Sequence, residues 1–133
     1  MVPALKHVSV PHPAPSPVIG LIRLAALECR ATPRHAVEAC AVLAPDAGAE
    51  DYVIALVRAL QGAADRRMVF WRPGAPDLSF DEAWLQALVR AYDSRDVDSQ
   101  RFLLTRRLRP SAVPIVRLLL RGLVDCMPRD AQD

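Results

Sequence analysis

Arginine is the residue type whose spacing most clearly indicates a binding chemistry in this chain. Residues 95–121 contain seven arginines against two aspartates, which gives a local net charge of +5. Each guanidinium is a planar fork of donors that pairs with a carboxylate or a phosphate through two hydrogen bonds. The arginines that form the candidate binding patch are Arg101, Arg106, Arg107, Arg109, Arg117 and Arg121.

A structural explanation competes with a functional one for this patch. Positive side chains near the C-terminus of a helix are favoured by its dipole, and charge runs are usually solvated faces whose members pair locally. The local partners would be Asp96, Asp98 and Asp125. A functional patch would instead hold a phosphate or an acidic protein surface.

Nucleic-acid binding is the alternative function for the same arginines. They lie on two predicted helices joined by a short turn, an order that resembles a helix-turn-helix. The second helix of that motif reads bases with polar side chains, and the segment after Ser111 offers few of them. Phe102 is the only aromatic residue in the basic stretch, whereas single-strand binding uses several stacking aromatics. The residues therefore favour a protein partner over nucleic acid.

A second candidate contact lies at Trp71 and Arg72. Aromatic residues at the spacing of Phe70, Trp71, Phe80 and Trp84 usually belong to a core. An exposed Trp71 beside Arg72 would instead anchor a partner, because tryptophan and arginine dominate protein–protein hot spots.

Metal-ligating and nucleophilic residue types are present but poorly spaced. Cys29, His35 and Cys40 are chemically capable zinc ligands, yet spacings of six and five match no zinc module and no fourth ligand accompanies them. A Cys40 nucleophile with His35 as its base would need two residues five positions apart on one helix to touch, which is a poor spacing for contact. We therefore expect no metal site and no cofactor.

Paired carboxylates are explained by helix capping. Asp81–Glu82 and Asp96–Asp98 are residue types that serve in acid–base catalysis. Both pairs stand where a helix should begin, and Ser79 to Glu82 matches a capping box. We therefore expect no enzyme activity.

The apolar residues recur with a helical period and predict an all-α fold of five to six short helices. Their N-termini are indicated by Ser16, Thr32, Ser79, Asp96 or Asp98, and Ser111. The predicted helices cover residues 17–30, 33–44, 49–65, 79–93, 96–109 and 111–127.

The same periodicity predicts which side chains are buried. Asp81 and Gln86 fall on the solvent side of their helix, and Val97 and Phe102 fall on the apolar side of theirs. The last helix is apolar except for the line of Arg117, Arg121 and Asp125, and so is expected at the centre of the bundle.

The stretch 66–78 breaks the helical period. Residues 68–71 form an apolar run that favours extended structure, and residues 72–77 carry turn chemistry. We predict an extended surface crossing whose Phe70 and Trp71 tuck under the bundle. The sequence offers no convincing partner strand.

Length and composition indicate one globular domain. The chain has 133 residues, is 52% hydrophobic and carries a net charge of +2, a composition that favours a folded domain over disorder of the whole chain. The predicted organisation is an irregular Pro-rich arm over 1–16, a helical domain over 17–127 and an acidic tail over 128–133.

Several features favour a cytoplasmic location. No apolar stretch reaches the ~20 residues of a membrane span, and the N-terminus is a poor secretion signal. Three cysteines without a CxxC pair suit a reducing compartment. The abundance of Arg, Ala and Pro over Lys suggests a GC-rich bacterial genome.

These observations predict a small, non-enzymatic bacterial binding or regulatory module that contacts a protein partner. Its arginines would steer the partner and an aromatic anchor would be buried on contact. Self-association through the leucine-rich last helix is a third hypothesis.

Overall fold

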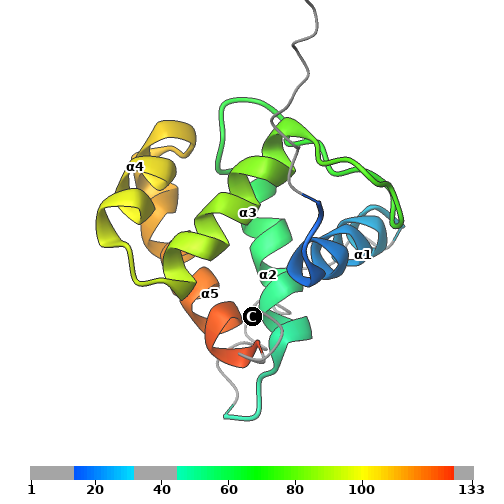
Figure 1. The fold of residues 1–133 in the computed structure, drawn as a ribbon, viewed down its shortest axis with the longest axis horizontal. Coiled ribbons are helices and arrows are strands. Elements are labelled where there is room, and N and C mark those ends of the chain that lie inside the picture. Colours follow the sequence, from blue (N-terminus) through cyan, green and yellow to red (C-terminus); the bar gives the residue numbers. More distant parts are fainter. Residues whose placement is uncertain (1–13, 32–44, 128–133) are drawn as a thin grey trace, which may run out of the picture.

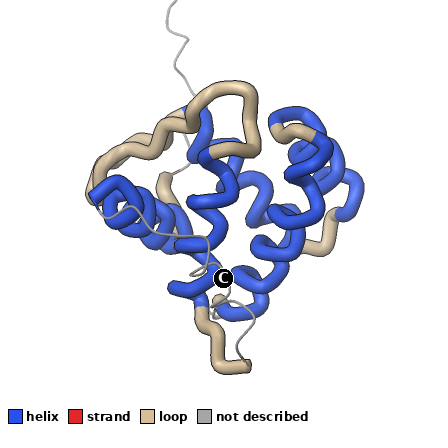
Figure 2. Tube along the Cα trace, turned by 180° about the vertical axis from the view of Figure 1, so that it is seen from behind, coloured by secondary structure: helices blue, strands red, loops and turns tan. Residues whose placement is uncertain are grey.

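The computed structural model describes residues 14–31 and 45–127, and in these ranges the fold is all-α, as predicted (Figures 1 and 2). No strand occurs within these ranges, and a single antiparallel bridge joins Ala64 to Leu108. The predicted helix over 33–44, most of the arm and the tail lie outside the described residues. The helices are α1 Pro17–Ala31, α2 Ala49–Gln61, α3 Phe80–Asp93, α4 Val97–Arg107, the 3₁₀ turn η3 Pro110–Ala112 and α5 Val113–Cys126.

The core lies where α2 packs against both α1 and α5, with α3 joining α1, α4 and α5 (Figure 1). Each of these helices contributes leucine or isoleucine side chains at helical spacing to the same cluster. The largest fully buried ones are Ile19, Ile22, Leu56, Leu60, Leu85, Leu88, Leu104, Leu120 and Leu123. The prediction of inward-facing stripes is therefore confirmed for α2 and α3, whereas Leu24 and Leu27 of α1, predicted to face inward, are exposed by 56% and 47%.

Helix α5 approaches α2 closely because it carries a glycine at the contact. A Cβ atom added at Gly122 would stand 2.1 Å from Tyr52 Cε1, so no larger residue fits without movement. The polar line of Arg117, Arg121 and Asp125 is exposed, as predicted. The rest of α5 is less buried than expected, because Ile115 and Leu118 are exposed by 45% and 54%.

Two predicted helix caps are present and two are not. Ser79 Oγ accepts the Glu82 amide at 3.0 Å while Glu82 Oε1 accepts the Ser79 amide at 2.9 Å. Asp96 accepts the Ser99 amide at 3.1 Å. The caps at Ser16 and Ser111 were predicted wrongly. The Ser16 hydroxyl makes no hydrogen bond, and α5 begins after a 3₁₀ turn without a side-chain cap.

Helix α4 is attached to the rest by one face only. Leu104 and Leu108 are buried, and Trp84 Nε1 on α3 donates to the Leu103 carbonyl at 2.8 Å. Val97 and Phe102 were expected on the apolar side but are exposed by 57% and 58%. An 11-residue helix that packs mainly on α3 has room to bury only a narrow stripe.

Candidate functional site

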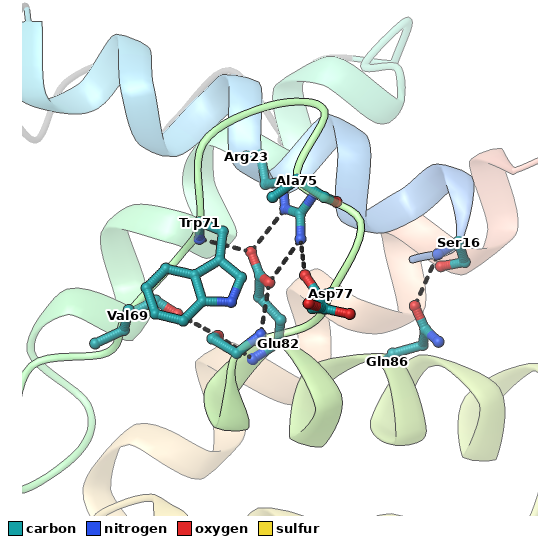
Figure 3. Close-up of polar contacts among 9 residues, drawn as sticks. Ser16, Arg23, Val69, Trp71, Ala75, Asp77, Glu82 and Gln86 are labelled. Atoms are coloured by element: carbon teal, nitrogen blue, oxygen red, sulfur yellow. Dashed lines mark hydrogen bonds and ion pairs between the residues drawn. The ribbon is translucent and has the colours of Figure 1, made fainter. Parts of the chain in front are cut away.

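The segment between α2 and α3 is fixed to the N-terminus of α3 by side chains (Figure 3). Asp81 Oδ2 accepts the Val69 amide at 2.7 Å, and Glu82 Oε2 accepts the Trp71 amide at 2.9 Å. The Ser79 hydroxyl donates to the Val69 carbonyl at 2.6 Å. These side chains occupy the place that a neighbouring strand would take.

A buried ion pair between α1 and α3 anchors this arrangement. Arg23 Nε and Nη2 donate to Glu82 Oε2 and Oε1, each at 2.9 Å. The remaining Arg23 donors reach the Ala75 and Asp77 carbonyls at 2.8 Å, so one guanidinium holds the far end of the loop as well. The two side chains are exposed by only 3% and 0%.

The electrostatics keep both partners charged. Burial opposes ionisation of Glu82, but hydrogen bonds from Arg23 and from the Ser79 and Trp71 amides outweigh it, and the pKa of Glu82 lies below its ordinary value. The hydrogen bond to Glu82 raises the pKa of Arg23 against the opposing effect of burial. The pair is therefore a fixed structural unit at neutral pH.

Two polar residues of α3 that were predicted to face water are buried instead. Asp81 is exposed by 4% because it binds the Val69 amide and forms an ion pair with Arg107. Gln86 is exposed by 5%, accepts the Ser16 amide at 2.8 Å and donates to the Ala14 carbonyl at 3.0 Å. Both prediction errors arise because these partners are distant in the sequence.

The pinned segment presents alternate side chains to solvent. Met68 is buried and Phe70 half-buried, whereas Val69 and Trp71 are exposed by 45% and 44%. This period of two is that of an extended chain. Because the Val69 and Trp71 amides are held by carboxylates of α3, their side chains cannot turn inward. The prediction that Trp71 tucks under the bundle is therefore wrong.

Phe80, the first residue of α3, adds to this surface with 68% exposure. The Arg107 guanidinium lies over its ring, 5.1 Å from the centroid, and 5.7 Å from that of Trp84. The same guanidinium pairs with Asp81, and its side chain is exposed by only 12%. We call Val69, Trp71, Phe80 and Arg107 the aromatic face.

The arginines predicted as one patch are divided among several environments. Arg107 belongs to the aromatic face, while Arg106 lies over the exposed Phe102 ring at 5.4 Å. Arg109 Nη1 donates to the Gly62 carbonyl at 2.8 Å and so caps the C-terminal end of α2. Within the described residues none of the six pairs with Asp96, Asp98 or Asp125.

The other predicted arginines line a groove between α4 and α5. Arg101 and Arg117 share a small pocket there. Arg121 lines the adjoining pocket with Arg95, and the two pockets have Val97 and Gln100 in common. Neither pocket is lined by a residue of the aromatic face.

Arg72, the last predicted site residue, lies exposed next to Trp71. Both line an open hollow of about 540 Å³ together with Phe70, Ala75, Pro76, Asp77 and Leu78. The Trp71–Arg72 pair that the sequence singled out is thus on the surface. Arg107, which lies over Phe80, is linked to this segment through Asp81, whose other carboxylate oxygen accepts the Val69 amide.

Nothing in the described residues gathers three potential metal ligands. Cys29 is buried, and His35 and Cys40, which completed the sequence-based zinc set, lie outside the described ranges. None of the helices described is both long and apolar enough to cross a bilayer. Comparison with protein-family models, with curated proteins and with solved structures finds no match to this chain.

Proposed function

We propose that this chain is a non-enzymatic binding module that contacts a protein partner through the aromatic face and Arg72. The observation that carries the proposal is the pinning of Val69 and Trp71 outward by hydrogen bonds to Asp81 and Glu82. Apolar side chains held outside the core in a cluster mark interaction surfaces. Here the buried carboxylates of Asp81 and Glu82 hold the two side chains outside the core.

Rigidity of the face supports the proposal. The segment is fastened at Val69, Trp71, Ala75 and Asp77 by α1 and α3. A surface that is already ordered loses little conformational entropy on binding. Its composition also matches protein–protein hot spots, which are enriched in tryptophan and arginine.

The exposed arginines around the face supply attraction over distance. Arg66, Arg67 and Arg72 lie within seven residues of one another along the segment, and all are exposed. Positive charge around an apolar anchor raises the rate of encounter with an acidic partner. We also propose, from the composition of the sequence, that the protein is a compact bundle with a Pro-rich arm and that it acts as a regulatory protein in the bacterial cytoplasm.

The α4–α5 groove favours nucleic-acid binding as a second candidate function. Four arginines, Arg95, Arg101, Arg117 and Arg121, line its two pockets. Phosphate contacts release counterions, so this function predicts a steep loss of affinity with salt. A protein interface centred on the aromatic face responds much less, and a salt titration separates the two.

The proposal is tested by affinity capture with matched aromatic variants. Trp71→Ala and Phe80→Ala remove rings exposed by 44% and 68% from the face, and Phe102→Ala removes a ring exposed by 58% from α4 outside it. We expect partners bound by the wild type and by Phe102→Ala to be lost from both face variants, and the purified partner to bind the wild type and Phe102→Ala, but neither face variant, in calorimetry. Equal capture by all four proteins contradicts the proposal.

A further inference from the structure

We propose that the partner binds the aromatic face as an extended, acidic segment that adds a strand to residues 68–72. This inference rests on the proposed function and adds how the partner binds and which kind of segment it offers. It begins from the backbone of the pinned segment, which has one edge occupied and one edge open.

The occupied edge is the one that faces α3. In an extended chain the main-chain N–H and C=O groups of successive residues point to opposite edges. Val69 directs its N–H to Asp81 and its C=O to the Ser79 hydroxyl, and Trp71 directs its N–H to Glu82. Side chains of α3 thus complete this edge as a strand would.

The open edge carries the main-chain groups of Phe70 and Arg72. Neither the N–H nor the C=O of Phe70 makes a hydrogen bond within the described chain, and the same holds for the Arg72 N–H. Because buried amides are almost always paired, unpaired ones belong at a surface. Phe70 and Arg72 also line the open hollow of about 540 Å³, which residues 75–78 of the returning chain line as well.

The open edge has a defined end. The Arg72 carbonyl accepts the Ala75 amide at 3.2 Å, and Pro73 has no N–H to offer. A partner strand can therefore exchange two hydrogen bonds with Phe70 and receive one from Arg72 before the chain turns away. Main-chain pairing of this kind gives affinity in strand addition, while side chains select the sequence.

Charge identifies the class of segment. Residues 66–77 contain Arg66, Arg67 and Arg72 against one acidic residue, Asp77, which gives a net charge of +2. The nearby carboxylates of Asp81 and Glu82 are already paired with Arg107 and Arg23. An acidic segment is attracted to this edge, whereas a second copy of the same segment is repelled by its own arginines.

The test starts from short random peptides displayed on phage and selected on the full-length protein. A selected peptide is then resynthesised with single N-methyl groups, and binding is measured by calorimetry. We expect acidic peptides whose affinity falls by about tenfold for N-methylation at every second residue only. We also expect exchange of the Phe70 amide to slow by about tenfold in NMR, with the Val69 and Trp71 amides unchanged.

The outcomes separate this inference from the proposed function. Peptides that require Trp71 and Phe80 but show no alternation on N-methylation, or leave Phe70 exchange unaltered, overturn strand addition and retain the binding face. Peptides insensitive to Trp71→Ala and Phe80→Ala, or no selected peptide, overturn both. If the double variant Arg66→Glu/Arg67→Glu binds the selected peptides with undiminished affinity, the inference that the partner segment is acidic is overturned.

Discussion

The buried pair of Arg23 and Glu82 allows a sharp test of how the binding face is held. In Glu82→Ala the Arg23 guanidinium stays in the core, where its side chain is only 3% exposed, without its counter-charge. The Trp71 and Ser79 amides lose their acceptor in the same step. Breaking a buried ion pair from one side costs about 3–5 kcal/mol.

That loss is a large fraction of the stability of a small domain, which is about 5–15 kcal/mol. Urea unfolding followed by far-UV circular dichroism measures it directly. Glu50→Ala is the matched control, because Glu50 is exposed in the first turn of α2 and surface changes usually stay within about 0.5 kcal/mol.

Replacing both Arg23 and Glu82 separates the energetic cost of an unpaired buried charge from that of lost packing. We expect Arg23→Met/Glu82→Leu to be more stable than Glu82→Ala alone, because no uncompensated charge remains. Four main-chain groups of the loop still lose their partners, so the double variant stays below the wild type. A loss under about 1 kcal/mol for Glu82→Ala would refute the reasoning.

Further predictions address pH, packing and capping. The pKa of Glu82 is lower in the folded than in the unfolded protein. Its contribution to stability is therefore complete above the unfolded pKa of about 4.3 and is lost as pH falls through the folded pKa. Unfolding measured at graded pH should show this loss in the wild type and not in Glu82→Gln. Gly122→Ala should cost about 1–3 kcal/mol through the clash with Tyr52, while Gly20→Ala, with nothing within 4 Å of the added Cβ, should stabilise by about 0.5–1 kcal/mol in the same thermal melts. A neutral result at Gly122 would show that Tyr52 moves aside. Ser79→Ala removes both the N-cap of α3 and the hydrogen bond to the Val69 carbonyl. We expect the free energy of unfolding to fall by about 1–2 kcal/mol and amide exchange at the N-terminal end of α3 to become faster. A fall in stability without faster exchange there would show that the loss comes from the loop and not from the cap.

The aromatic face was only partly accessible to prediction. Trp71 and Arg72 were singled out by residue type, and an exposed Trp71 was named as the condition for an anchor. The spacing of Phe80 from the other aromatic residues predicts a core position, whereas the fold leaves it exposed by 68% at the first position of α3. Arg23, a charged residue among the apolar residues of α1, is the signal in the sequence that indicates a buried partner.

The arginine patch shows why nearness in the sequence does not make a surface. Successive residues of an α-helix point about 100° apart. Arg106 therefore lies over Phe102 on the exposed side, while Arg107 turns to Asp81 and Phe80 on the side of α3. Arg109, beyond the helix, is drawn to the end of α2 by the bridge between Ala64 and Leu108.

The helices can be predicted from the sequence, because helical period and the Ser79 and Asp96 caps act between residues at most a few positions apart. Which polar groups are buried and which aromatic rings are exposed depends instead on how the helices pack against one another. Glu82 is a cap in either description, but its burial depends on Arg23, 59 residues away. Pairing at such separation is set by how α1 and α3 pack, and the outward direction of Val69 and Trp71 follows from it.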